Sequence, residues 1–164
     1  MRVRLLVVAL SLLGLQACAA ALGNLSAVVQ PPRFEQVPGQ SAEIRLAGFE
    51  GAAVRLWTRV SNPNAFGIRV GTLKGTLFLD DARAADADFP LGLDLGARAE
   101  SELPIDISVS FRDLPGLANV GRKIASRQPI GYRLDGTIGI DAARIGQDMV
   151  FGPMTLLRGE TTVR

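Results

Sequence analysis

The sequence predicts a mainly β protein, a seven-stranded antiparallel β-sandwich of the fibronectin type III or immunoglobulin kind with one α-helix near residues 115–127. Three observations predict this fold. Apolar and polar residues alternate with a period of two in several segments, which is typical of strands with one buried face. Glycine, proline and asparagine separate these segments at short intervals, as in β-sandwiches. Residues 113–127 instead have apolar residues at helical spacing.

The first part of the expected domain, residues 27–50, has the weakest pattern. A strand is expected to begin at Ala27–Val29, but a Pro-Pro pair follows directly, and proline within a strand favours the edge of a sheet. Val-Pro-Gly at residues 37–39 predicts a turn, and residues 43–49 are expected to form the next strand.

The middle of the chain has clearer alternation. Residues 54–60 place Val, Leu, Thr and Val on one face, and the sequence Asn62-Pro63-Asn64 is expected to end this strand as a structural turn. Residues 68–79 form the next expected strand. We expect residues 80–88, which are acidic and rich in alanine, to be a connector, followed by a short strand at residues 91–95.

The second half of the chain has two long alternating segments, residues 103–111 and 130–140, with the expected helix between them. Leu117, Val120 and Ile124 lie on one side of that helix. A last strand is expected over residues 149–157.

The N-terminus has the pattern of a secretory signal. Two arginines precede the apolar stretch Leu5–Leu15, which is too short to span a bilayer permanently. Leu15-Gln-Ala-Cys18 then resembles the lipobox of bacterial lipoproteins, which implies lipid attachment at Cys18 and cleavage before it. An ordinary signal peptide cut near Ala17 or Ala21 is the alternative.

These boundaries divide the chain into a lipoprotein signal peptide at residues 1–17, a lipid-anchored tether at 18–26 and a β-sandwich domain at 27–160. The resemblance implies a protein anchored in the bacterial cell envelope and facing the periplasm. Because Ala19 is not the aspartate that tends to retain enterobacterial lipoproteins at the inner membrane, the outer membrane is the favoured location.

The charge of the chain argues against a nucleic-acid partner. The full chain has 18 Lys and Arg against 16 Asp and Glu, but the signal peptide contains two of the arginines and no acidic residue. The mature chain therefore has balanced charge, whereas nucleic-acid binding needs a basic surface.

Catalytic and metal-binding patterns are weak. The chain contains no histidine, which excludes Ser-His-Asp triads, Cys-His pairs and histidine metal sites. Asp80, Asp81, Asp86 and Asp88 offer oxygen ligands for Ca²⁺, but the glycine and the closing glutamate of an EF-hand loop are missing. We therefore expect a polar hairpin loop there, and no catalytic residue, metal or cofactor.

Two surfaces are candidates for interactions. Arg55, Trp57 and Arg59 alternate with core residues, so they are expected to face outward, and Trp and Arg are enriched at binding hot spots. The alternative is that a loop or the helix covers Trp57. Arg122, Lys123 and Arg127 near the end of the helix could contact anionic lipid headgroups, or could simply favour the helix terminus and solubility.

The order of several segments resembles a known family. RVSNPNAFGIRVGTLKGTLFL is followed by LDLGARAESELPIDISVSF, the expected helix and QPIGYRLDGTIGID. This order is similar to that of the water-stress and hypersensitive-response (WHy) domain of the group-two late embryogenesis abundant (LEA type 2) proteins. The resemblance covers residues 54–160 and implies a seven-stranded sandwich with one helix, a link to drying, cold or osmotic stress, and no catalytic site.

Two functions remain open from the sequence. The first is a non-enzymatic envelope lipoprotein that protects membranes or proteins during desiccation or osmotic stress. The second is an accessory lipoprotein that binds one specific lipid or protein. In both, the partners are the membrane, through the N-terminal lipid, and weakly bound protein or phospholipid; the oligomeric state is undetermined by the sequence.

Overall fold

The computed structural model describes residues 29–48, 50–110, 118–142 and 147–161 of the chain. The chain divides into two compact units, Met1–Gln30 and Pro31–Arg164. Every helix and strand described below belongs to the second unit, which we call the β domain. The predicted signal peptide and tether, including Cys18, lie outside the described residues.

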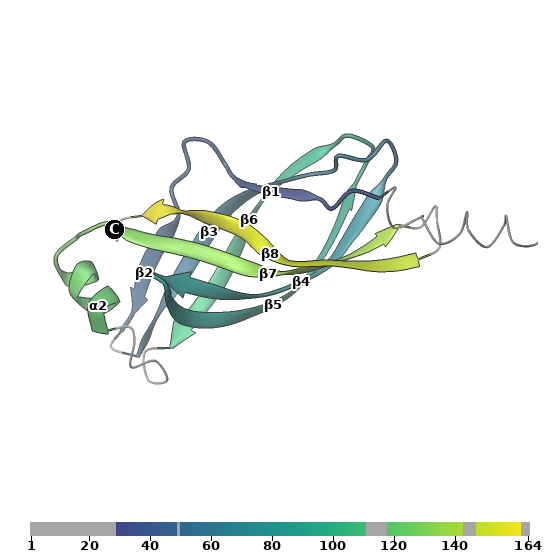
Figure 1. The fold of residues 1–164 in the computed structure, drawn as a ribbon. Helices are drawn as coiled ribbons and strands as arrows, with labels where there is room; N and C mark the ends of the chain where they lie inside the picture. The colour runs from purple at the N-terminus through teal and green to yellow at the C-terminus, as the bar shows by residue number, and fades with distance from the viewer. Residues whose placement is uncertain (1–28, 49, 111–117, 143–146, 162–164) are drawn as a thin grey trace, which may run out of the picture. The chain divides into compact units, whose positions relative to one another are not determined.

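The β domain contains two four-stranded antiparallel sheets and one described helix (Figure 1). The elements follow the order β1 (Arg33–Gln36), β2 (Glu43–Ala47), β3 (Gly51–Ser61), β4 (Ile68–Leu79), β5 (Ala82–Leu95), β6 (Glu100–Ser110), α2 (Ala118–Ala125), β7 (Ile130–Ala142) and β8 (Gln147–Thr161).

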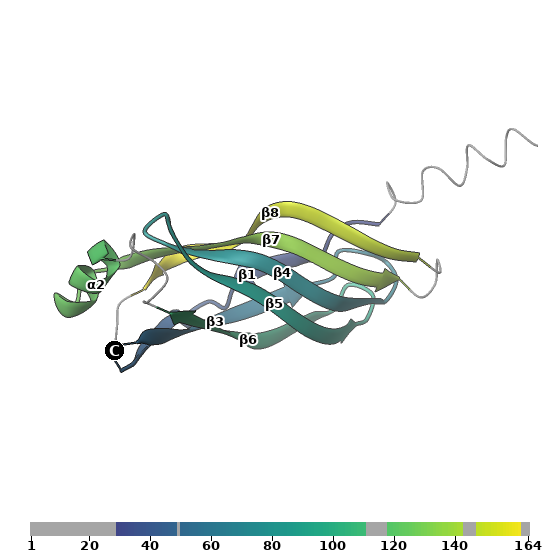
Figure 2. The ribbon, with the colours of Figure 1, turned by 90° about the horizontal axis from the view of Figure 1, so that it is seen from below.

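The two sheets lie one above the other as layers (Figure 2). In sheet A, β3 is the central strand: β6 pairs along its whole length on one side, while β1 and β2 pair with its opposite ends on the other side. Sheet B has the order β5-β4-β7-β8. The prediction of a mainly β, antiparallel fold with a helix is therefore confirmed, and the finer likeness to immunoglobulin or fibronectin type III domains stays a prediction.

The predicted number of seven strands is wrong, because the described residues contain eight. At the edge of sheet A, the turn predicted at residues 37–39 lies within the segment Val37–Ala42, which separates β1 from β2. Val37 still donates its backbone N–H to the carbonyl of Trp57, at 3.0 Å, before the chain turns away. One edge position is thus occupied by two short strands.

The connector predicted at residues 80–88 is also wrong. Only Asp80 and Asp81 form the turn, both with positive φ (47° and 64°), as in the type I′ turns that join hairpin strands. β5 begins directly at Ala82 and includes the short strand predicted at residues 91–95. Its core face has Ala84 and Ala87, whose small side chains make the alternation hard to recognise.

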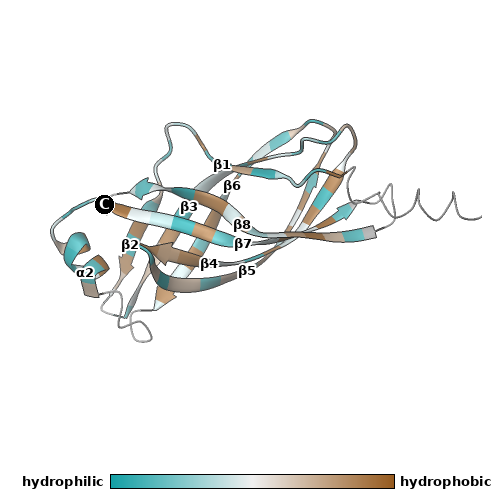
Figure 3. Cartoon of the chain, viewed as in Figure 1, coloured by the Kyte–Doolittle hydropathy of each residue, from teal (hydrophilic) through white to brown (hydrophobic). Residues whose placement is uncertain are grey.

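The core lies between the sheets, and hydrophobic and hydrophilic residues alternate along the strands that enclose it (Figure 3). The alternation predicted for residues 54–60, 68–79, 103–111 and 130–140 agrees with the buried face wherever these residues are described. The largest fully buried side chains belong to both sheets: Ile44, Leu56, Leu73, Leu77, Leu79, Ile105, Ile130, Leu134, Ile138 and Ile140.

The helix α2 lies within the predicted range, and its buried residues are Val120 and Ile124, as the helical spacing predicted. Leu117 lies outside the described residues.

The strand registers define two ends of the β domain. At the asparagine end, β3 leads into the loop 62–67 and β5 leads into the loop 96–99. At the helix end, β4 and β5 are joined by the Asp80–Asp81 turn, and α2 leads into β7. Arg33 pairs with Ser61, so β1 begins at the asparagine end. This is the end of the strands opposite to α2.

Candidate functional site

The predicted outward residues of β3 form one continuous surface with β6. Arg55, Trp57 and Arg59 lie opposite Asp106, Pro104 and Glu102, respectively, in the strand register. We call these six residues the arginine–tryptophan face. Val54, Leu56, Thr58 and Val60 point into the core instead, so the sequence placed this face correctly.

Ion pairs hold both arginines of this face against β6. Arg55 donates two hydrogen bonds to the Asp106 carboxylate, at 2.7 and 2.9 Å. Arg59 donates to Glu102 at 3.1 and 2.6 Å. The hydrogen bond from Arg55 lowers the pKa of Asp106 from its usual value, against the opposing effect of partial burial. The charges are therefore paired and fixed in position across the two strands.

Trp57 lies between these two ion pairs and is half-buried. The guanidinium of Arg55 lies 5.8 Å from the centre of the indole ring, which allows a cation–π contact. Pro104 is the neighbour of Trp57 on β6 and is exposed. The face thus has an apolar centre, with one cross-strand ion pair on each side of it along the strands. This arrangement is suited to protein contacts.

The Asn62-Pro63-Asn64 turn is a buried polar cluster. Asn62 is 2% exposed and its side-chain N–H groups donate to the carbonyls of Phe66 and Gly96, at 2.7 and 2.8 Å. Its Oδ1 accepts from the backbone and side-chain nitrogens of Asn64, each at 3.0 Å. The cluster joins the loop 62–67 to the loop 96–99, so the geometry explains these residues structurally.

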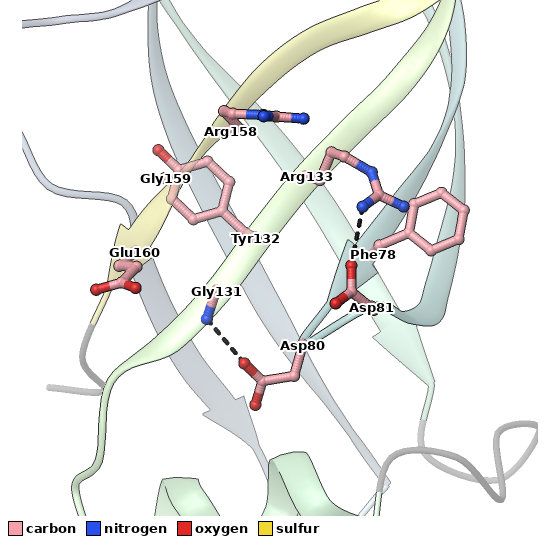
Figure 4. A pocket seen from close by; sticks show the side chains of 9 residues that line it. All are labelled: Phe78, Asp80, Asp81, Gly131, Tyr132, Arg133, Arg158, Gly159 and Glu160. Carbon is pink, nitrogen blue, oxygen red and sulfur yellow. Dashed lines mark hydrogen bonds and ion pairs between the residues drawn. The ribbon is translucent and has the colours of Figure 1, made fainter.

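An open depression of about 420 Å³ lies near the helix end of sheet B (Figure 4). Arg133 donates to Asp81 at 2.8 Å, and its guanidinium lies 4.6 Å from the ring centre of Phe78. Exposed Arg158 and Glu160 add one cation and one anion to the rim. Such a shallow, mixed-charge surface suits weak polar contacts more than enclosure of an apolar ligand.

The predicted basic end of the helix also lies near this depression. Lys123 pairs with Asp80 at 2.7 Å, and Asp80 accepts from the backbone N–H of Gly131 at 3.0 Å. Partial burial acts to raise the pKa of Asp80, but Lys123 and the Gly131 N–H together keep it below its usual value. Lys123 therefore attaches the helix to the β4–β5 turn, while Arg122 and Arg127 are exposed.

The remaining expectations concern lipid, metal and membrane. Cys18 lies outside the described residues. Within the part of the chain that the structure describes, no three acidic or cysteine side chains gather closely enough to hold a metal ion. The same part contains no helix long and apolar enough to cross a membrane.

Sequence reasoning missed one polar link between the sheets. The hydroxyl of Tyr132 on β7 donates to Gln36 on β1 at 2.9 Å, and Gln36 in turn donates to the carbonyl of Gln40 at 2.8 Å. Residues 36 and 132 carry no shared local motif, so no sequence signal connects them.

Comparisons with known proteins agree with this fold. The model of the family described as late embryogenesis abundant protein matches residues 58–148. The solution structure of AT1g01470 from Arabidopsis thaliana is similar, with a TM-score of 0.59 and 19% identity over 75% of this chain and 78% of that one. A second solution structure, described as the late embryogenesis abundant (LEA) protein At2g46140.1, gives a TM-score of 0.56 and 16% identity over 90% and 79%. A search of curated proteins found no match.

Proposed function

Because the chain belongs to the late embryogenesis abundant protein family, whose model spans residues 58–148, we propose that it protects membrane or protein surfaces of the bacterial envelope when water is lost. The family match is the observation that carries this proposal. The family is generally non-enzymatic and stress-related, and the proposed activity needs no turnover. We assign the β domain to the WHy type within it, on the segment order described above.

The outer faces of both sheets support a role under water loss. Ion pairs join neighbouring strands on these faces: Arg55–Asp106, Arg59–Glu102, Arg69–Asp94 and Lys74–Asp88. Exposed pairs of this kind contribute only about 0–1 kcal/mol each in water. Coulomb attraction grows as the dielectric constant of the surroundings falls, so these pairs should attract each other more strongly when water is lost. We therefore expect drying to strengthen the links between strands and so to help the domain keep a folded surface.

We further propose that Cys18 carries the lipid that holds this surface in the outer membrane. The support is the lipobox-like sequence that precedes Cys18. Several acyl chains, at about 0.8 kcal/mol per buried methylene, would anchor the protein stably. In cell fractionation, wild-type protein should remain with the outer membrane, and Cys18→Ala should lose both the lipid mass and the membrane association. A Cys18→Ala protein that stays in the membrane would argue against lipid anchoring.

The protective function is tested by drying. A labile enzyme is dried and rehydrated with residues 19–164, or with an equal mass of an unrelated β-sandwich of the same size. Recovery well above the control supports protection, and equal recovery means that generic crowding explains the effect.

A matched variant tests the physical basis of this function. Lys74→Gln with Asp88→Asn removes one cross-strand ion pair from sheet B while preserving side-chain size. We expect its free energy of unfolding in water to change by less than about 1 kcal/mol. In dried films, infrared spectra should show more loss of strand structure than for the wild type. Equal spectra would show that the ion pairs do not preserve the fold.

The alternative function, specific binding of one lipid or protein, is favoured by the arginine–tryptophan face. Trp57 is the single tryptophan of the chain, so its fluorescence reports on that face directly. A saturable shift with one envelope component, together with no protection in the drying assay, would select this alternative.

A further inference from the structure

The arginine–tryptophan face has a charge pattern that is complementary to itself. Its β3 side is basic, with Arg55 and Arg59, and its β6 side is acidic, with Glu102 and Asp106. Between them lies the uncharged pair Trp57 and Pro104. Opposite charges thus occupy two parallel rows, one strand spacing or about 4.8 Å apart.

Two symmetric arrangements can bring this face against a second copy. If the two-fold axis lies in the interface and runs across the strands, β3 covers β3 of the second copy, and arginine meets arginine. If the axis runs along the strands between β3 and β6, each β3 covers the β6 of the other copy. Arg55 then faces Asp106 of the second copy, and Arg59 faces Glu102 of the second copy. Only the second arrangement is electrostatically favourable.

On this basis we propose that the arginine–tryptophan face binds a second copy of this chain, with Trp57 of each copy packed on Pro104 of the other. The interface is isologous, so each ion pair within a chain becomes part of a group of four alternating charges. Arg55 and Asp106 remain 36% and 57% exposed as side chains, which leaves both able to make such additional contacts. This proposal does not depend on the protective function.

The twist of the sheets restricts the contact to the centre of the face. Stacked sheets cross at about 30°, so residues far from the centre of the contact move apart. Arg55 and Arg59 are each two residues from Trp57, or about 7 Å along the strand, and therefore stay close to their partners. Two strands of this length cover a few hundred Å², less than the roughly 800 Å² per partner of a stable interface. We expect a weak, reversible dimer.

A charge-swapped variant provides the sharpest test. Arg55→Asp and Arg59→Glu are combined with Glu102→Arg and Asp106→Arg, so that each cross-strand pair survives in reversed orientation. The swapped chain should associate with itself as the wild type does. It should not associate with the wild type, because equal charges would then meet across the interface. Sedimentation of residues 19–164, with one chain fluorescently labelled, distinguishes these cases from micromolar to millimolar concentration.

Two further variants supply a control and a second test. Lys74→Asp with Asp88→Lys reverses an ion pair on the outer face of sheet B and should mix freely with the wild type. Trp57→Ala preserves all four charges of the face and should raise the dimer Kd by about tenfold or more, as expected for a central hot-spot residue. It keeps the test decisive if the swapped chain does not fold.

The proposal is overturned if the swapped chain mixes freely with the wild type, if Trp57→Ala leaves the Kd unchanged, or if the wild type remains monomeric at millimolar concentration.

Discussion

Different interactions hold the loops at the asparagine end and the helix at the helix end of the β domain. At the asparagine end, Asn62 is 2% exposed and connects two loops with neutral hydrogen bonds, most of them between 2.7 and 3.0 Å. At the helix end, α2 is held by two buried side chains and by the Lys123–Asp80 ion pair, whose side chains are 38% and 21% exposed. Buried hydrogen bonds of amide groups are costly to break, whereas exposed ion pairs contribute little to stability. We therefore expect a rigid asparagine end and a helix that opens more easily.

The largest effect is expected at the asparagine end. Asn62→Ala removes the donors to the Phe66 and Gly96 carbonyls and leaves these groups without that partner. Because unsatisfied buried polar groups cost about 1–3 kcal/mol, we expect a loss of about 2–3 kcal/mol in the free energy of unfolding, measured with urea. Asn119→Ala, at an exposed position of α2, is the control and should change it by less than about 0.5 kcal/mol. Equal effects at both positions would remove the contrast between the ends.

A smaller effect is expected from the buried face of the helix. Val120 is 1% exposed, and Val120→Ala removes its buried methyl groups. This should lower the free energy of unfolding by about 1 kcal/mol, after the better helix propensity of alanine is included. Hydrogen exchange should become faster in α2 while the strands remain protected. Gly121→Ala is the matched control, because an added Cβ meets nothing within 4 Å and alanine should slow exchange in the helix. Equal acceleration throughout the domain would contradict separate opening of α2.

The Lys123–Asp80 ion pair should make the stability of the α2 attachment depend on pH. The pKa of Asp80 is lowered in the folded protein from its ordinary value of 3.8, so this carboxylate stabilises the attachment at higher pH. The contribution is fully present above the unfolded pKa and is lost as pH falls through the lower, folded value. It should be smaller than about 1 kcal/mol, because Lys123 is partly exposed.

Asp80→Asn isolates this contribution, because asparagine can still accept from the Gly131 N–H and tolerates positive φ. Hydrogen exchange of α2 should differ between the wild type and Asp80→Asn at pH 6 and converge at acidic pH. A difference that persists at low pH would show that the charge of Asp80 is not responsible. The asparagine end, built from neutral amides, should show no such change.

The smallest effect is expected from the turn at the helix end. Asp81 has a φ of 64°, which glycine adopts without strain and which suits the Asp-Gly sequence of type I′ turns. Asp81→Gly should therefore raise the free energy of unfolding by about 0.5 kcal/mol, although it removes the exposed contact with Arg133. Urea unfolding measures the change. A decrease would mean that the Arg133 contact outweighs the backbone strain.

Several elements of the fold could be predicted because their pattern is local. Residues 68–79 form a strand with the predicted limits, since large apolar side chains recur on one face. Residues 82–90 were missed because Ala84 and Ala87 are buried but small. The turn between β1 and β2 could be predicted from Val37-Pro38-Gly39, but the pairing of both strands with β3 could not, because it joins segments that are distant in the chain.

The candidate site was predicted in part. Alternation with core residues placed Arg55, Trp57 and Arg59 on the outer face. Their partners Glu102 and Asp106 lie 43 and 51 residues away along the chain, and no local pattern indicates them. The role of Asn62 as a turn residue could be expected, but its bond to the Gly96 carbonyl depends on the meeting of two distant loops.

The sequence by itself determined which side chains face the core, because the period of a strand depends only on neighbouring residues. The tertiary structure alone decided which strands are neighbours, which charges pair and which loops meet. These features depend on register between segments distant in the chain, and register is set by the packing of the whole core. The self-complementary pattern of the arginine–tryptophan face therefore becomes visible only after β3 and β6 are paired.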